Sequence, residues 1–221
     1  MWMTELPPFM PFFIGALLLL LTRGMLRSAI MIAIPIISAM HLSLVPEGVH
    51  LQFAFFDYQL TPYRLDKLSL MFGYVFHIAA LIGIIYSLHL RDTMQQVAAM
   101  LYAGSALGAV FAGDLLTLFV FWELLAFTSV FLILARRTQR AYDAAMRYLI
   151  IQVLSGVILL VGALFYAAEN DTLAFGYIGL DSIAGWLILI AFGIKCAFPF
   201  AHNWLTDSYP EATVTGTVFL S

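Results

Sequence analysis

The sequence predicts an all-α integral membrane protein with about seven transmembrane helices and the start of an eighth. Of its 221 residues, 63% are hydrophobic and only 10% are charged, whereas ordinary globular domains are about 25% charged. The mean hydropathy is +0.97. The apolar residues form seven separate runs, each close to the length of about 20 residues that crosses a bilayer. A soluble domain needs enough polar side chains to cover its surface, and this composition supplies too few of them.

Each of the seven apolar runs predicts one helix, and the loops between them carry most of the charge. The first run has neither a basic segment before it nor a small-residue cleavage site after it, so it is a helix rather than a signal peptide. The seventh run contains a proline, which predicts a broken helix. The runs are Pro7–Leu21, Ala29–Val45, Leu68–Leu88, Val97–Ala112, Leu115–Ala135, Tyr148–Ala168 and Ile183–Leu205.

The loop between the second and third helices differs from the others. From Glu47 to Asp66 it contains HLQFAFFDYQL, whose partial alternation and aromatic content predict a short extracytoplasmic β-hairpin. At the other end of the sequence, EATVTGTVFLS begins an eighth apolar run. We expect two regions: 1–95, with helices one to three and the periplasmic hairpin, and 96–221, with helices four to seven and the start of eight.

Positive charge gathers in alternate loops. Arginines follow the first, third and fifth helices, and most of the acidic residues lie in the intervening loops. Because basic loops stay in the cytoplasm, we expect a multi-pass protein of the inner (plasma) membrane with its N-terminus in the periplasm. The arginines of the three basic loops are Arg23, Arg27, Arg91, Arg136, Arg137, Arg140 and Arg147.

Several classes of function are excluded by what the sequence contains. The net charge of −3 gives no indication of a nucleic-acid partner, and the single cysteine, Cys196, permits no internal disulfide. The sequence has no glycine-rich phosphate loop, no His/Cys cluster with metal-ligand spacing and no Ser-His-Asp pattern. We therefore expect no cofactor, no metal and no catalysis of the chain's own.

Two ionisable residues fall near the centres of predicted spans. Glu123 lies in the fifth helix and Lys195 in the seventh, and each costs about 2.5–3.5 kcal/mol on insertion scales. One interpretation is a structural ion pair that locks the two helices together. The favoured interpretation is a pair that conducts protons. Arg147, in the first turn of the sixth helix, is either an interface anchor or a partner that reaches Glu123 from the cytoplasmic side.

Pro199 comes four residues after Lys195. A proline has no N–H to donate to the carbonyl four residues back, so we expect it to leave the Lys195 carbonyl free and to break the seventh helix there. Broken helices at membrane depth line hydrated cavities and ion sites. Polar residues follow the proline in the same helix, which favours that interpretation over an ordinary kink: His202, Asn203, Thr206 and Asp207.

Four other polar residues have simpler interpretations. His77 lies in the middle of the third helix and His41 in the outer half of the second. A lone membrane histidine is most often a hydrogen-bonded packing residue. Asp66 and Asp114 each precede a predicted helix, where an N-cap role is sufficient.

Four segments of the sequence carry a resemblance: LDKLSLMF, LFVFWELLAFTSVFLI, AAMRYLIIQVLSG and GIKCAFPFAHNWLTDSYPEATVTGTVFLS. This resemblance is to the antiporter-like membrane subunits, namely the D-type subunit of the multisubunit Mrp sodium/proton antiporters and the proton-pumping subunits of respiratory complex I. It implies that Glu123 and Lys195 form the proton-handling pair, and it matches family positions at His202, Trp204 and Asp207. The family's proline is often one place after Pro199, and Thr206 stands where proline is frequent.

The resemblance also implies a larger assembly. The family fold has about fourteen helices in two inverted five-helix repeats, of which 96–221 would be an incomplete first repeat, so we expect this chain to be a fragment. The implied partners are other membrane subunits, the lipid bilayer, protons and a monovalent cation, with Na+ favoured. The main hypothesis is a cation/proton antiporter subunit, and the alternative is a proton-pumping subunit of a redox complex such as an NADH:quinone oxidoreductase or a membrane hydrogenase. A retinal photoreceptor, suggested by a lysine in helix seven, is disfavoured by the proline-broken helix and the hairpin.

Overall fold

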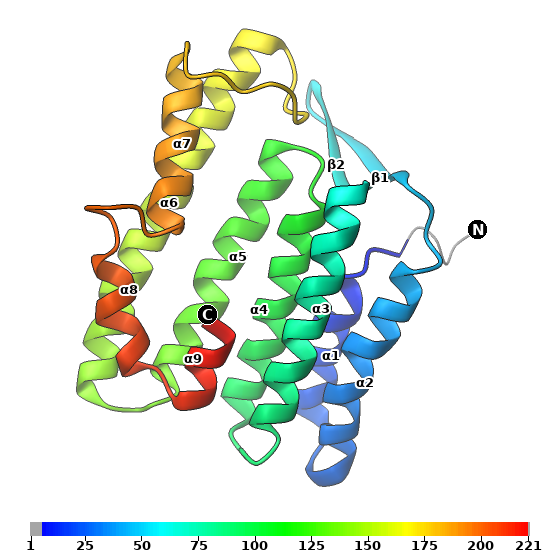
Figure 1. Cartoon of the computed structure of the whole chain (residues 1–221), viewed down its shortest axis with the longest axis vertical. Helices are drawn as coiled ribbons and strands as arrows, with labels where there is room; N and C mark the ends of the chain where they lie inside the picture. The colour runs from blue at the N-terminus through cyan, green and yellow to red at the C-terminus, as the bar shows by residue number, and fades with distance from the viewer. Residues whose placement is uncertain (1–5, 221) are drawn as a thin grey trace.

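The computed structural model of the chain describes residues 6–220, which are mostly helical (Figure 1). Two antiparallel strands interrupt the helices between α2 and α3. A single 3-10 helix, η1, lies between α8 and α9. The elements are α1 (Met10–Leu21), α2 (Gly24–Leu42), β1 (Gly48–Phe55), β2 (Tyr58–Leu65), α3 (Lys67–Ser87), α4 (Thr93–Phe111), α5 (Leu115–Leu134), α6 (Gln139–Asn170), α7 (Ile183–Lys195), α8 (Asn203–Ser208), η1 (Tyr209–Glu211) and α9 (Val214–Leu220).

Each of the seven predicted spans overlaps one of the helices α1 to α7. Within the described residues, the five helices α2 to α6 are long and apolar enough to cross a membrane, and α1 and α7 are shorter, with 12 and 13 residues. The chain is therefore a multi-pass membrane protein. The predicted start of the sixth helix at Tyr148 was wrong, because Thr138 caps α6 well before Tyr148 by accepting a hydrogen bond from the N–H of Ala141 at 3.1 Å.

The two strands pair along most of their length, from Gly48 opposite Leu65 to Phe55 opposite Tyr58. The turn between them places Phe56 at a positive φ of 52°. The inner part of the hairpin is anchored on the helices, since Thr61 donates its N–H to the Asp114 carboxylate at 2.6 Å.

Both aspartates predicted as N-caps have that role. Asp66 forms a capping box with Ser69, and the Ser69 backbone N–H holds the pKa of the Asp66 carboxyl below its usual value. Asp114 is fully buried and accepts from the Thr117 N–H and hydroxyl, both at 2.7 Å, as well as from Thr61. Asp114 therefore does more than the predicted N-cap, because it also binds the hairpin to the start of α5.

Most connections between helices lie at two opposite ends of the bundle, while the segment between α7 and α8 lies about midway (Figure 1). At one end Arg137, after α5, forms an ion pair with Asp92, before α4, at 2.8 Å. At the other end the N–H of Leu115 donates to the carbonyl of Leu173 at 2.9 Å, beside the hairpin. The arginine-rich loops thus share one end, and the hairpin shares the other end with the α6–α7 loop.

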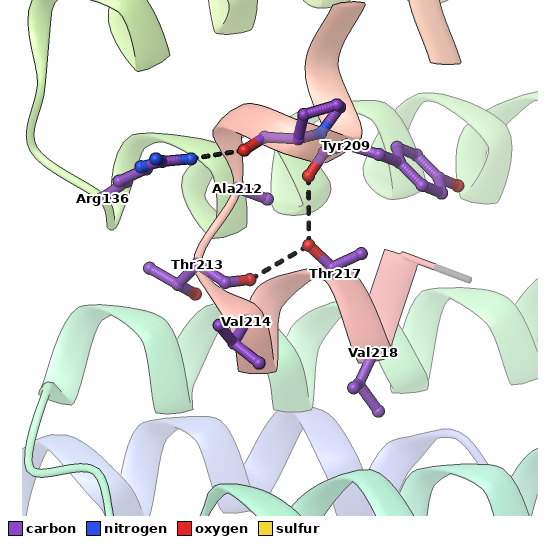
Figure 2. A pocket seen from close by; sticks show the side chains of 8 residues that line it. Arg136, Tyr209, Ala212, Thr213, Val214, Thr217 and Val218 are labelled. Carbon is purple, nitrogen blue, oxygen red and sulfur yellow. Dashed lines mark hydrogen bonds between the residues drawn. The ribbon is translucent and has the colours of Figure 1, made fainter. Parts of the chain in front are cut away.

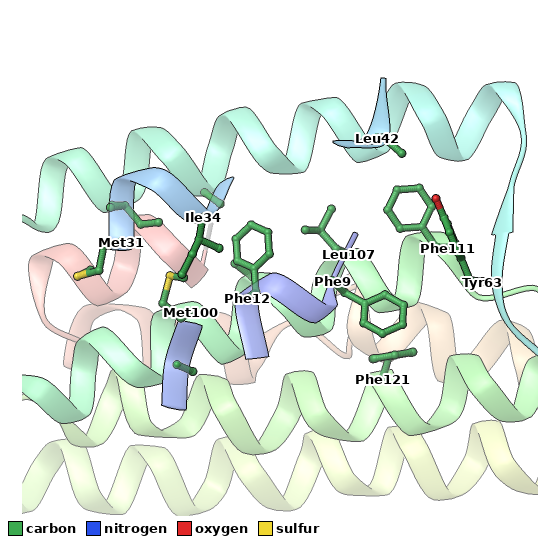
Figure 3. Close-up of a cluster of buried hydrophobic side chains, with 14 of the residues drawn as sticks. Phe9, Phe12, Met31, Ile34, Leu42, Tyr63, Met100, Leu107, Phe111 and Phe121 are labelled. Atoms are coloured by element: carbon green, nitrogen blue, oxygen red, sulfur yellow. The ribbon is translucent and has the colours of Figure 1, made fainter. Parts of the chain in front are cut away.

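Large apolar side chains fill the space between α1, α2, α3 and α4 (Figure 3). Their shared feature is almost complete burial, as for Phe12, Met31, Met100, Leu107 and Phe111. Helices of the second region also approach each other closely. A Cβ on Gly162 of α6 would come within 2.9 Å of the Ile188 side chain and 3.1 Å of its backbone nitrogen. This close contact fixes α7 against α6 near the candidate site.

Candidate functional site

The Glu123 side chain leaves α5 toward α6. Its Oε1 atom is buried and lies over Gly156, so closely that a Cβ at position 156 would overlap the carboxyl group. Among residues 6–220 this oxygen has no hydrogen-bond partner. Buried polar atoms are almost always paired, so this carboxyl oxygen, without a partner among the described residues, makes Glu123 a candidate for the functional site.

Lys195 is the last residue of α7. Its Nζ donates to the backbone carbonyl of Trp122 at 3.3 Å and lies 5.0 Å from the centroid of the Trp122 ring, a cation–π distance. Glu123 follows Trp122 directly, so the two ionisable side chains meet at one turn of α5. In the described part of the chain they make no direct ion pair, which argues against the structural ion-pair interpretation.

Trp122 connects the three helices around this pair. Its Nε1 donates to Ser155 Oγ of α6 at 3.1 Å, and the Ser155 hydroxyl donates to the carbonyl of Ala191 in α7 at 3.0 Å. The indole also meets Phe192 edge-on, with the ring centroids 4.8 Å apart. Trp122 is thus held on both sides, and its carbonyl presents a fixed acceptor to Lys195.

A polar column runs along α6 below Gly156. Gln152, one turn earlier, is 1% exposed, and both its amide nitrogen and its amide oxygen lack partners among the described residues. One further turn earlier, Tyr148 shares a 2.8 Å hydrogen bond with Ser129 of α5. Sequence reasoning missed Gln152, Ser155 and Gly156. Their helical spacing from Tyr148, which places all of them on one face of α6, was the signal that could have found them.

The seventh helix is interrupted as predicted, and the interruption begins before Pro199. The helix α7 ends at Lys195 in a Schellman motif: the Phe198 N–H donates to the Gly193 carbonyl at 2.9 Å and the Ala197 N–H to Ile194 at 3.2 Å. Ala197 adopts the left-handed conformation that this motif requires, with φ 53°. The helix has therefore turned away before Pro199, which only follows the motif, as prolines often do.

The structure places the supporting residues around α8 and the segment that precedes it. Arg147 does not bind Glu123: its Nε and Nη2 bind the two oxygens of Asp207 at 2.7 and 2.9 Å, which links α6 to α8. Trp204 donates its Nε1 to the Ile194 carbonyl at 2.9 Å and so holds α8 to the last turn of α7. His202 and Pro199 are exposed on the segment between these helices.

Beyond α8, the chain forms a hollow of about 890 Å³ at the arginine-rich end (Figure 2). Arg136 donates to the carbonyl of Pro210, and Arg136 and Arg140 form ion pairs with Glu211 at 3.7 and 3.8 Å. Thr217 of α9 donates to the carbonyl of Tyr209 at 3.1 Å. These contacts fasten the segment after α8 to the α5–α6 connection. Between residues 6 and 220 no cluster of His, Cys, Asp and Glu side chains could hold a metal ion.

The Schellman motif leads to a prediction for two variants. Ala197→Gly should raise the free energy of unfolding by about 1 kcal/mol, because glycine adopts the left-handed conformation without the cost that a Cβ imposes. Pro199→Ala should leave the break in place, because the helix ends before residue 199. Thermal unfolding measures the first effect, and spin-label distances between α7 and α8 measure the second. A continuous helix in Pro199→Ala would restore the proline as the cause.

Residues 112–221 match the family model described as NADH:quinone oxidoreductase/Mrp antiporter, TM. This segment contains α5, α6, α7 and the whole site. The NAD(P)H-quinone oxidoreductase chain 4-2 of Synechocystis sp. is 34% identical over 132 residues, which cover 55% of this chain and 23% of that protein. The D-type subunit of the Na(+)/H(+) antiporter of Bacillus subtilis is 30% identical over 120 residues, covering 49% of this chain and 24% of that one.

The fold extends the similarity beyond the matched segment. A chain of the Mrp complex from Dietzia sp. superimposes with a TM-score of 0.80 at 24% identity, over 96% of this chain and 26% of that one. This chain therefore spans about a quarter of the length of these relatives, and the shared fold includes α1 to α4. Residues 112–221 of this multi-pass membrane protein thus resemble the NADH:quinone oxidoreductase/Mrp antiporter family.

Proposed function

We propose that this chain is part of a membrane subunit of a multisubunit Na+/proton antiporter, in which protons move through Glu123 and Lys195. The observation that carries the proposal is the buried, unpaired carboxyl oxygen of Glu123 beside the Lys195 ammonium, at the point where α7 ends. A carboxyl group and an amine can both accept and release a proton, and at this position each does so away from bulk water.

The surroundings support exchange between the two groups. Lys195 is held by one carbonyl and one aromatic face rather than by a carboxylate, so its ammonium can move without breaking an ion pair. The chain between α7 and α8 is irregular, and irregular backbone at membrane depth is tolerated where it lines a cavity. We assign Arg147 and Asp207 the role of holding α8 in place, and His202 and Pro199 lie on the irregular segment.

The arrangement in the membrane follows from the charges. The chain crosses the membrane seven times, and the seventh crossing consists of α7, the irregular segment and α8. Because basic loops stay in the cytoplasm, the arginine-rich end is cytoplasmic, and the N-terminus and the hairpin lie outside the plasma membrane. On this basis 96–221 corresponds to part of an inverted repeat, and 1–95 to the helices that precede it. Other membrane subunits are the expected partners, because the structurally similar chain belongs to the Mrp complex.

The second candidate function is a proton-pumping subunit of a redox complex. The observation in its favour is the 34% identity to a quinone oxidoreductase chain of Synechocystis sp.. In that case the electron transfer would take place in other subunits, and the pair Glu123–Lys195 would still carry the protons.

The test is reconstitution of the complete complex that contains this chain. After purification under mild conditions, proteoliposomes are loaded with a Na+ gradient and internal pH is followed with a fluorescent dye. Proton movement driven by Na+ supports the antiporter. Proton movement that needs an added electron donor and quinone, together with flavin or iron–sulfur absorption, supports the redox pump and overturns the antiporter.

A further inference from the structure

A second buried polar network lies in the first region, among α1, α2 and α3, apart from Glu123 and Lys195. His77 of α3 is 2% exposed and Ser38 of α2 is fully buried. The His77 Nδ1 lies 2.7 Å from the Gly73 carbonyl oxygen, and its Nε2 lies 2.8 Å from the Ser38 Oγ. The Ser38 Oγ in turn lies 2.6 Å from the Pro8 carbonyl oxygen, just before α1.

This network is a chain of three close contacts that ends in a carbonyl at each side. Carbonyl oxygens only accept, so three hydrogen bonds need three hydrogens from the two side chains between them. A neutral imidazole supplies one hydrogen and the serine hydroxyl supplies one. Either neutral tautomer of His77 therefore leaves two acceptor atoms facing each other across one contact. An imidazolium supplies two hydrogens, and with the hydroxyl all three contacts become hydrogen bonds.

The remaining surroundings of His77 are apolar. The Phe12 ring packs edge-on at 5.6 Å between centroids. Two neighbouring helices carry no ionisable side chain among the described residues. These are α1, whose Phe12 packs on His77, and α9, which packs against α3. The helices α2 and α4 also pack against α3, and these three helices do carry other ionisable side chains. Among the described residues, none of these side chains makes an ion pair or hydrogen bond with the His77 ring: Arg27, His41, Lys67, Tyr74, Tyr86 and Tyr102. The network alone thus has to stabilise any charge on the ring.

We propose that His77, Ser38 and the carbonyls of Gly73 and Pro8 form a second proton-binding site, separate from Glu123 and Lys195. The site binds one proton through the imidazole ring and distributes its charge over two hydrogen bonds. An unpaired charge in an apolar bundle is costly, so the site takes up and releases its proton instead of holding it permanently. On release, one of the three contacts loses its hydrogen.

His41 gives this site a path toward the end of the bundle that carries the hairpin. It lies one turn after Ser38 on α2 and is half-buried, and its Nε2 lies 3.0 Å from the carbonyl oxygen of Leu6, which shortly precedes Pro8. Ser38 and His41 therefore face the same short segment that leads into α1. A proton that leaves His77 has Ser38 and His41 of α2 to follow toward the surface, beside the carbonyls of Leu6 and Pro8.

The test is nitrogen NMR of the full chain, labelled with ¹⁵N-histidine and reconstituted in lipid bilayers. The His77 signals are identified by subtraction of a His77→Asn spectrum. At about pH 6, close to the ordinary midpoint of histidine, both ring nitrogens of His77 should be mainly protonated. In Ser38→Ala the proton affinity of His77 should fall about tenfold, as the loss of one charge-assisted hydrogen bond predicts. A mainly unprotonated ring nitrogen in the wild-type chain at that pH would overturn the proposal.

Two control variants separate this site from other effects. Ser105→Ala removes another fully buried serine, one that donates only to the Leu101 carbonyl of its own helix α4, and should leave the His77 signals unchanged. Glu123→Gln should also leave them unchanged, because the two sites are separate, so the result does not depend on the proposed antiport. If Ser38→Ala does not fold, the wild-type spectrum alone decides. Equal proton affinity in Ser38→Ala and wild type would remove Ser38 from the site and contradict the hydrogen count.

Discussion

Glu123→Gln and Lys195→Ala are each expected to reduce ion-dependent proton movement about a hundredfold or more, the range typical for loss of a proton-transferring group. Glutamine keeps the shape of the side chain beside Gly156 but cannot release a proton from its amide. Alanine at 195 removes the amine that lies against the Trp122 carbonyl and ring. The measurement is proton flux in proteoliposomes that contain the complete complex at equal protein content.

Assembly has to be measured beside transport, because removal of one partner of a buried charged pair costs about 3–5 kcal/mol. The structure predicts a smaller loss, since Lys195 and Glu123 make no direct ion pair within residues 6–220. Glu169→Gln is the matched control, because it neutralises an exposed carboxylate near the end of α6 and should leave flux unchanged. Wild-type flux in an assembled Glu123→Gln or Lys195→Ala complex would reduce these residues to a structural role.

The sequence predicted the location of the helices well because the relevant signal is strong. An apolar run of the right length can satisfy its backbone hydrogen bonds inside a bilayer only as a helix, and each of the seven runs overlaps a helix. The N-caps Asp66 and Asp114 were also predictable, because each aspartate precedes an apolar run and Asp is a favoured N-cap residue. The ends of the helices were less accurate: α6 begins at Gln139, because a helix continues beyond the apolar run when a cap such as Thr138 lies further out.

The candidate site was only partly predictable, for a physical reason. Glu123 and Lys195 stand out because charge is rare in a span, but the groups that surround them are ordinary residues. Gly156 matters only because α5 places a carboxyl group above it, and Gln152 only because both its polar atoms are buried without partners among the described residues. The end of α7 likewise depends on Ala197, an alanine in a left-handed conformation, which nothing in its residue type suggests.

Gly156→Ala is therefore expected to have the second-largest effect on transport, although it changes no ionisable group. The added Cβ would overlap the Glu123 carboxyl group, which has to rotate away from α6 and from its place near Lys195. Proton flux should fall about tenfold, which is the effect of a displaced proton-transferring group rather than of a missing one. Overpacking of this kind also costs about 1–3 kcal/mol of stability, so flux is compared at equal amounts of assembled complex.

The double variant Gly156→Ala/Glu123→Asp shows whether displacement of the carboxyl group is the cause. Aspartate keeps the carboxyl group and is one methylene shorter, which leaves room for the alanine. If the carboxyl group has to sit over position 156, the double variant should transport protons faster than Gly156→Ala alone, and the two changes should be coupled by about 0.5–3 kcal/mol. Gly83→Ala is the control, because the atoms nearest to its Cβ would be those of the Phe219 ring, from 3.0 Å, away from the site. Strictly additive losses would show that Gly156 acts through the packing of α6 alone, and that the space it leaves for Glu123 has no part in proton transfer.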